Sequence, residues 1–194
     1  MNPQRLSAIL LIAIFVAVIF TTIINAPGLY QTQDINERLQ IIETYRTRWL
    51  ISQTLVVIYS LLTIIGFSLL ASTLMTTGRA WIPVLGAAAM VAGTISGLYF
   101  LYLQTIDPRG GYSGAYPLPE SVTYWLWLAG TLLFGFAFLQ VGLPAWLGYV
   151  TVGTAIVYGL IFLLTGAGFM TPFLVALLTL VIGIVLLIRP IAVA

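Results

Sequence analysis

The sequence predicts an all-α fold, a polytopic transmembrane bundle of six helices with an amphipathic helix in the first outer loop. Two observations predict it. Six stretches of 17 to 25 residues contain no ionised side chain, and only 6% of all residues are charged whereas 61% are hydrophobic. Roughly 20 apolar residues in a helix cross the hydrocarbon core of a bilayer. A typical soluble domain has about 25% charged residues, so this composition excludes one.

The six uncharged stretches are the expected membrane spans. They are residues 6–24, 49–73, 81–103, 122–140, 146–165 and 172–188. Backbone groups in hydrocarbon must be hydrogen-bonded within the segment, and these stretches are too long for barrel strands, so we expect each to be helical. The chain is therefore expected to form a single six-helix transmembrane domain, residues 1–194.

The first stretch also has features of a secretory signal, because Arg5 precedes an apolar run that ends near Asn25 and Ala26. The run is long for a signal core, and Ile24 occupies a position where a small residue is wanted. We expect a retained first helix.

The charges between the stretches predict the orientation. Segments 1–5, 77–80, 141–145 and 189–194 would share one side of the membrane, and they contain arginines but no acid. All five acids would lie on the other side, with four arginines. Arginine near the span ends marks the cytoplasmic side, and the first set is richer in arginine per residue. We expect a multi-pass protein of the cell membrane with both termini cytoplasmic.

The first outer loop predicts a helix of its own. Asp34 followed by Glu37 fits a helix N-cap with a capping box. Ile35, Leu39 and Ile42 then follow at helical spacing. Two pairs are spaced to interact across a helical turn: Asp34 with Arg38, and Glu43 with Arg46.

The second outer loop, residues 104–120, is rich in Gly and Pro and is expected to be irregular. Together with the first loop it would form an outer mouth lined by aromatic side chains. Such a concavity with a few polar groups is typical of a small-molecule site. The expected ligand-binding residues are Gln53, Tyr99, Tyr102, Arg109, Tyr116 and Trp125.

Small residues recur at four-residue spacing in the first and third stretches, as Ala13-x-x-x-Ala17 and Ala89-x-x-x-Gly93-x-x-x-Gly97. Such spacing allows two helices to approach closely in a membrane. The pattern predicts packing within the bundle or docking of a partner subunit.

The chain has no Cys, His or Lys, and these absences exclude several activities. Usual zinc sites, ordinary haem ligands and thiol redox pairs need Cys or His, and a retinal Schiff base needs Lys. We therefore expect no cofactor, no metal site and no catalytic residue. The net charge of +2 does not indicate a nucleic-acid partner.

Two family resemblances bear on function. The short first helix, the loop ending in Arg48-Trp49-Leu50 and the stretch at residues 133–148 resemble uncharacterised bacterial six-span membrane proteins grouped under a domain of unknown function. That resemblance implies no functional residue. The six spans, the long first loop and Ala13-x-x-x-Ala17 are similar to the substrate-capturing subunits of energy-coupling-factor vitamin importers, which dock through a first-helix seam.

Three functions remain open. The first is a non-enzymatic membrane protein, either an accessory subunit of a partner membrane protein or a binder of a hydrophobic small molecule or lipid at the outer mouth. The second is the substrate-binding component of a membrane transporter. The third is a lipid-active enzyme that uses outer-face carboxylates, with Glu43, Asp107, Arg109 and Glu120 as candidates.

Overall fold

The structure is a computed structural model that describes residues 2–75, 80–165, 171–189 and 191. Over these residues the chain forms eight helices. They are α1 (Pro3–Ile24), α2 (Ile35–Thr44), α3 (Arg46–Leu74), α4 (Trp81–Ile106), α5 (Pro108–Ser113), α6 (Pro117–Phe138), α7 (Ala145–Thr165) and α8 (Thr171–Ile188). The all-α prediction is confirmed for the described part of the chain.

Five of these helices are long and apolar enough to cross a membrane: α1, α3, α4, α6 and α7. The sixth expected span corresponds to α8, which is apolar but shorter. At about 1.5 Å per residue, its 18 residues extend roughly 27 Å, a little less than the hydrocarbon thickness of about 30 Å. The chain is thus a multi-pass membrane protein with five candidate spans and one shorter apolar helix.

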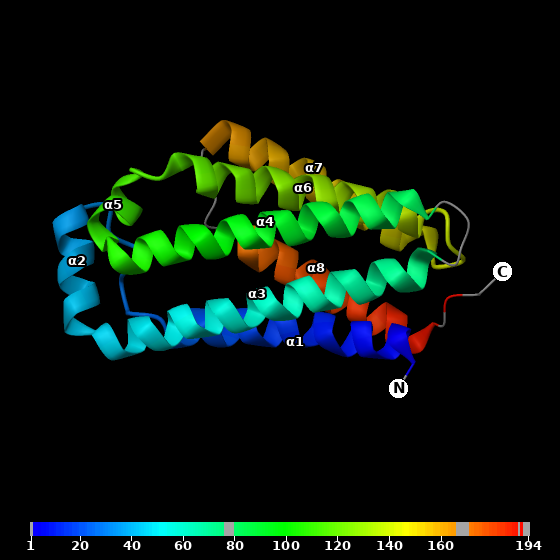
Figure 1. The fold of residues 1–194 in the computed structure, drawn as a ribbon, viewed down its shortest axis with the longest axis horizontal. Helices are drawn as coiled ribbons and strands as arrows, with labels where there is room; N and C mark the ends of the chain where they lie inside the picture. Colours follow the sequence, from blue (N-terminus) through cyan, green and yellow to red (C-terminus); the bar gives the residue numbers. More distant parts are fainter. Residues whose placement is uncertain (1, 76–79, 166–170, 190, 192–194) are drawn as a thin grey trace.

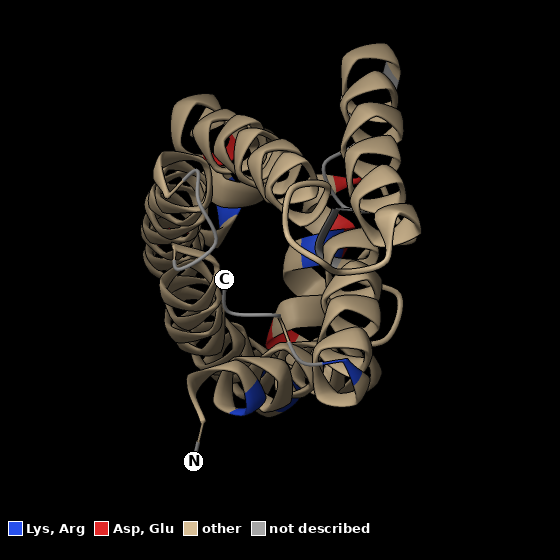
Figure 2. Cartoon of the chain, turned by 90° about the vertical axis from the view of Figure 1, so that its right-hand side faces the viewer, with Lys and Arg blue, Asp and Glu red and all other residues tan. Residues whose placement is uncertain are grey.

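The six apolar helices run along the long axis of the molecule and surround a common interior (Figures 1 and 2). Neighbours around this ring follow the order α8, α1, α3, α4, α6 and α7. The ring closes between α7 and α8, and the interface between these two helices is the smallest in the ring. The helices α2 and α5 lie together at one end, which we call the capped end, and both chain termini lie at the other, the terminal end (Figure 1).

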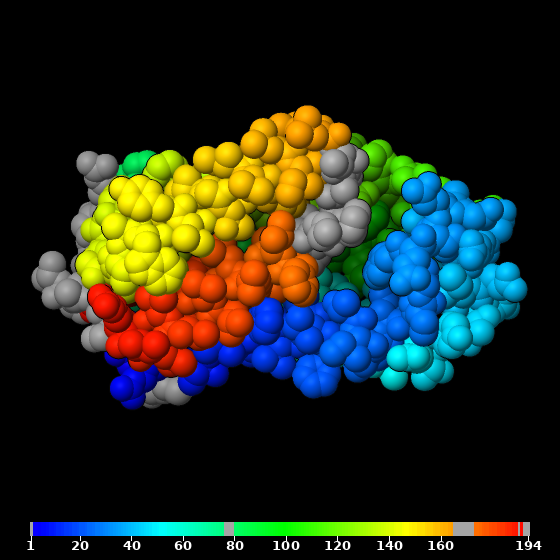
Figure 3. All heavy atoms as spheres, turned by 180° about the vertical axis from the view of Figure 1, so that it is seen from behind, coloured from blue at the N-terminus to red at the C-terminus, as the bar shows by residue number. Residues whose placement is uncertain are grey.

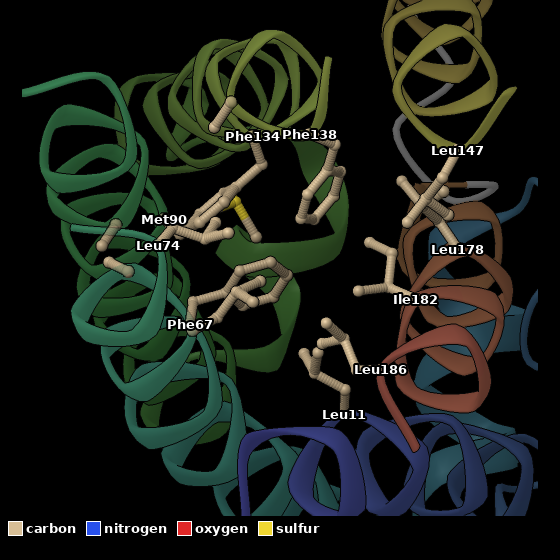
Figure 4. Packing of buried hydrophobic residues seen from close by; sticks show 14 of the residues in the cluster. Leu11, Phe67, Leu74, Met90, Phe134, Phe138, Leu147, Leu178, Ile182 and Leu186 are labelled. Carbon is tan, nitrogen blue, oxygen red and sulfur yellow. The ribbon is translucent and has the colours of Figure 1, made fainter. Parts of the chain in front are cut away.

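The interior of the terminal half is an apolar core. Figure 4 shows side chains from all six helices of the ring pointing toward one another. They include Leu11, Phe67, Met90, Phe134, Phe138, Leu147 and Ile182. The rings of Phe67 and Phe134 join α3 to α6 with centroids 5.1 Å apart. This packing fixes the positions of the helices on which the site at the capped end is built.

Small residues allow the close helix contacts that the spacing predicts. A Cβ atom on Gly93 of α4 would lie 2.7 Å from Cδ1 of Trp127 in α6, and one on Gly97 would lie 3.2 Å from Thr123 Cγ2. The seam of the third stretch is therefore used within the bundle. Ala13 and Ala17 are half-buried on α1, which packs against both α3 and α8.

The predicted helix in the first loop is confirmed as α2. The Asp34 carboxylate caps it by accepting from the backbone N–H groups of Asn36 (2.7 Å) and Glu37 (3.2 Å). The capping box is incomplete, because the Glu37 carboxylate accepts from the Thr32 hydroxyl rather than from the backbone of Asp34. The backbone N–H of Asp34 instead donates to that same hydroxyl.

The expectation of an irregular second loop is wrong for residues 108–113, which form α5. Proline suits the first position of a helix, where the backbone N–H would have no partner in the helix, and Pro108 occupies that position. Asp107 caps the helix, because its carboxylate accepts from the Gly110 N–H at 3.0 Å. Gly114 then ends it with φ +76°, a left-handed conformation that glycine adopts without strain. The same Gly and Pro residues that predicted irregularity thus delimit a short helix.

Candidate functional site

The helices α2 and α5, which together we call the cap, are attached to the bundle through the Tyr112 side chain of α5. Its hydroxyl accepts a hydrogen bond from Nε1 of Trp49, near the start of α3, at 3.3 Å. The Arg38 guanidinium of α2 lies over its ring, 5.9 Å from the centroid, at a distance typical of a cation–π contact. Beneath these contacts is a small apolar cluster of Ala26, Leu29, Ile42 and Trp49, with Ile41 and Tyr112 against it.

The first loop is held against α3 by polar contacts. The Asn25 side-chain oxygen accepts from the Ser52 hydroxyl at 3.1 Å and from the Ala26 N–H at 2.8 Å. Nε of Arg48 donates to the Ile24 carbonyl at 3.2 Å and so satisfies an acceptor at the end of α1. These bonds position Tyr30, which follows in the same loop.

Neither predicted ion pair of the first loop forms among the described residues. Arg38 instead donates from Nε to the Thr32 carbonyl at 2.8 Å and covers the Tyr112 ring. Glu43 and Arg46 are both exposed. Exposed pairs of this kind contribute only about 0 to 1 kcal/mol, so packing and backbone bonds decide the conformation here.

Directly below the cap, polar side chains face the interior. Burial raises the pKa of the Tyr112 hydroxyl, and the nearby Tyr30 phenol adds to the rise, while Trp49, Arg38 and Gln53 oppose it. Tyr112 is therefore neutral at physiological pH, and its hydroxyl accepts the hydrogen bond from Trp49. Tyr30 also lies within electrostatic range of Tyr59, which follows Gln53 along α3.

The opposite wall of the interior contributes three more polar side chains. In α6 the Tyr124 hydroxyl donates to the Glu120 carboxylate at 3.3 Å. Tyr124 interacts electrostatically with Tyr158 of α7 and with Tyr59 of α3. Seven side chains from α3, α5, α6, α7 and the first loop thus converge, and we call them the tyrosine cluster: Tyr30, Gln53, Tyr59, Tyr112, Glu120, Tyr124 and Tyr158.

One face of the molecule is hollowed. Figure 3 shows this hollow between α8, α1 and α2, with more distant atoms of the α4 to α6 region visible within it. Tyr30 is 65% exposed, although it interacts with the inner residues Tyr59 and Tyr112. Tyr59 and Tyr124 are only half-buried. The interior of the capped half therefore leaves accessible polar surface, unlike the apolar core of the terminal half.

A second polar group lies at the edge of the cap. The Asp107 carboxylate accepts from the Gly110 N–H and, at 2.7 Å, from the Tyr116 hydroxyl. These two hydrogen bonds lower the pKa of Asp107, and the bond to the carboxylate raises the pKa of Tyr116. Arg109 donates from Nη2 to the Asn36 side-chain oxygen at 3.0 Å and so links α5 to α2.

The six expected ligand-binding residues are distributed over α3, α4, α5, α6 and the segment before α6. Gln53 belongs to the tyrosine cluster, whereas Arg109 and Tyr116 stabilise the cap. The other three have exposed side chains on α4 and α6: Tyr99 (55%), Tyr102 (58%) and Trp125 (43%). Trp125 packs edge-on against Phe162 of α7, with centroids 5.6 Å apart.

Sequence reasoning missed most of the tyrosine cluster, above all Tyr112, Tyr124 and Tyr158. One signal was present, because Tyr59 shares a helical face with Ser52, Ser60 and Thr63, and these three side chains are buried. A polar face on a membrane helix points toward the protein interior. Which residues of the other helices meet that face depends on helix rotation, which the sequence does not specify.

The carboxylates expected for a lipid-active enzyme are not brought together. Asp107 engages Tyr116, Glu120 engages Tyr124, and Glu43 is exposed on α2. In the part of the chain that the structure describes, no group of three or more His, Cys, Asp and Glu side chains is placed to hold a metal ion.

The fold and site define the class of protein: an all-α, multi-pass integral membrane protein with a capped, partly polar interior. The comparisons with known proteins add no family to this class. No protein-family model matches the chain, and no curated protein or solved structure is significantly similar to it.

Proposed function

We propose that this protein is a non-enzymatic membrane protein that binds a hydrophobic small molecule or a lipid inside the helix ring. The polar part of the ligand contacts the tyrosine cluster, and its apolar part lies among the ring helices. The observation that supports this most directly is the convergence of five tyrosines, Gln53 and Glu120 below the cap.

The composition of the cluster suits a ligand that has both polar and apolar parts. Ligand sites are mostly apolar and aromatic, with a few polar groups that orient the ligand. Tyrosine offers a large apolar ring and one hydroxyl, so a cluster of tyrosines binds apolar surface while satisfying a few hydrogen bonds. Polar groups inside a membrane bundle are expensive to bury and usually serve a function.

In this proposal the rim residues have supporting roles. Arg109 and Tyr116 hold the cap closed over the cluster, while Tyr99, Tyr102 and Trp125 contact the surrounding lipid or a partner membrane subunit. The capped end faces the outside of the cell, and both termini are cytoplasmic. The ligand enters through the hollow between α8, α1 and α2.

The test is to identify what the protein retains from its native membrane. The chain is purified in a mild detergent, and its bound molecules are extracted and quantified by mass spectrometry. We expect one hydrophobic compound in near-stoichiometric amount. Gln53→Leu combined with Tyr59→Phe keeps the side-chain volume but removes polar atoms from the cluster, so we expect retention to fall about tenfold.

The matched control is Tyr149→Phe, which removes one hydroxyl from a 67% exposed tyrosine at the terminal end. Its retention should equal that of the unmodified protein. Native mass spectrometry showing no retained molecule, or equal retention by the cluster variant and the control, would contradict the proposed function.

A further inference from the structure

The first turn of α1 and the end of α8 are held together at the terminal end of the bundle. A Cβ atom on Gly183 of α8 would lie 2.8 Å from Cγ1 of Ile12, so the two helices are in close contact. Beyond this contact, Nε2 of Gln4 donates to the Arg189 carbonyl at 2.9 Å. The backbone at Arg189 is thereby held beside the first turn of α1, which contains Arg5.

The side chains of these two arginines have no counter-charge in the chain around them. Arg5 and Arg189 are exposed, and neither guanidinium forms a hydrogen bond or an ion pair with the described residues. The acidic side chains all belong to segments at the capped end: Asp34, Glu37, Glu43, Asp107 and Glu120. The end of the α1/α8 pair therefore has a positive charge that no acidic side chain balances.

Apolar side chains next to the two arginines are exposed on the outside of the bundle. Ile9 lies one turn after Arg5 in α1, and Ile184 and Leu187 lie near the end of α8. An arginine at the end of a membrane helix reaches the layer of lipid headgroups, while its apolar neighbours contact the acyl chains. Phosphate is the anion of that layer, and a guanidinium binds phosphate through two parallel hydrogen bonds.

We propose that Arg5 and Arg189 bind the phosphate of an anionic phospholipid, with an acyl chain against Ile9 and Leu187. An anionic lipid is favoured over a zwitterionic one, because a choline headgroup would bring a positive charge to a place without an acidic side chain. A lipid bound to both arginines links α1 to α8 and so adds to the effect of Gln4 on the shortest helix of the ring. This site is at the opposite end from the tyrosine cluster and does not depend on the proposed function.

The test measures lipid binding to the full chain by native mass spectrometry from neutral maltoside micelles. The probes are dioctanoyl phosphatidylglycerol, which is anionic, and dioctanoyl phosphatidylcholine, which has the same chains and phosphate but a zwitterionic headgroup. We expect the anionic lipid to bind about tenfold more tightly. It should also raise the midpoint of thermal unfolding more than the zwitterionic lipid does, because it binds only the folded protein.

Three variants assign this preference to the α1/α8 pair. Arg5→Gln combined with Arg189→Gln should abolish the preference and leave the binding of phosphatidylcholine unchanged. Gln4→Leu keeps both arginines but removes the hydrogen bonds that hold Arg189 beside α1, so the preference should fall to about twofold. The control Arg46→Gln removes an exposed arginine at the capped end and should bind like the unmodified protein. Each variant is required to remain helical by circular dichroism.

Each outcome supports or overturns the site. Loss of the preference in the double arginine variant, with an unchanged control, supports it. An equal loss in Arg46→Gln overturns it, because any arginine would then serve. An unchanged preference in Gln4→Leu overturns a site that α1 and α8 share. Displacement of phosphatidylglycerol by an equal concentration of inorganic phosphate overturns a lipid as the ligand. The retention of a molecule at the tyrosine cluster is measured separately and is unaffected by these results.

The proposal thus names a lipid-binding surface and its consequence for the fold. A bilayer rich in anionic phospholipid should hold the end of α8 against α1 more firmly than a zwitterionic one. Hydrogen exchange in the last turn of α8 should therefore slow about twofold to fivefold on addition of phosphatidylglycerol. No slowing, or the same slowing with phosphatidylcholine, would contradict the link between α1 and α8.

Discussion

At the scale of single residues, close contact between helices in this bundle depends on glycines, whose side chain is a single hydrogen atom. Gly93 has a buried backbone facing Trp127, Leu126 and the Thr123 carbonyl of α6. The Trp127 ring cannot easily move aside, because its Nε1 donates to the buried Thr94 hydroxyl at 3.1 Å. The interface between α4 and α6 therefore has no room for a methyl group at this position.

Gly93→Ala should destabilise the protein by about 1 to 3 kcal/mol, because overpacking outweighs the better helix propensity of alanine. The measurement is the midpoint of thermal unfolding in detergent, followed by tryptophan fluorescence. Gly153→Ala is the matched control, since a Cβ there meets no atom within 4 Å, and it should be neutral or stabilising by up to about 1 kcal/mol. Equal midpoints for the two variants would rule out the tight interface.

At the scale of elements, the end of α8 is held by a side chain from another helix. Gln4 of α1 performs this role for α8: its Nε2 donates to the Leu186 carbonyl at 2.7 Å and to the Arg189 carbonyl at 2.9 Å. Its Oε1 accepts from the Ile191 N–H at 3.0 Å. One side chain therefore ties the first helix to the last.

Gln4→Leu keeps a side chain of similar volume but removes the hydrogen bonds that hold the end of α8. The unpaired carbonyls should lower the free energy of unfolding by about 1 to 3 kcal/mol. Hydrogen exchange followed by mass spectrometry should show faster exchange in the last turn of α8. Gln140→Leu, at an exposed site near the same end, provides the comparison and should leave that turn unchanged. Unaltered exchange in Gln4→Leu would mean that Gln4 does not hold α8.

The helical elements of this chain could largely be predicted from its sequence, and α2 illustrates why. Its cap at Asp34 and its apolar positions at Ile35, Leu39 and Ile42 are local features, and all were recognisable. The short helix α5 was missed, because Gly110 and Gly111 have low helix propensity. A Cβ on Gly111 would lie 2.4 Å from Cγ of Gln104 and one on Gly110 would lie 2.1 Å from Oδ2 of Asp107, so close packing is the reason for glycine at both positions.

At the scale of the whole molecule, the ring places both termini at one end and the cap at the other (Figure 1). Five helices of the ring are candidate spans, and the shorter apolar helix α8 packs between α1 and α7. An 18-residue apolar helix spans a bilayer if the lipid thins locally or flanking residues reach the interface. Both adjustments cost fractions of a kcal/mol per Å of mismatch.

The absence of cysteine makes this topology easy to test, because each introduced cysteine is the only one in the chain. In intact cells, a membrane-impermeant maleimide should label Glu43→Cys in α2. It should label Pro3→Cys and Arg189→Cys only after the cells are permeabilised. Labelling of Arg189→Cys together with Glu43→Cys in intact cells would show that α8 does not cross. Reversed labelling of all three would refute cytoplasmic termini but keep six crossings.

The sequence by itself determined the class of this protein and most of its helices, because length, uncharged composition and capping residues act locally and need no knowledge of neighbours. It also indicated that one face of α3, with Tyr59, is polar. Only the tertiary structure decided that Tyr112 of α5 and Tyr124 of α6 lie near α3, and that Tyr99 and Tyr102 are exposed. The physical reason is that lipid and protein interior are both apolar, so hydropathy alone does not specify how each helix is rotated within the ring.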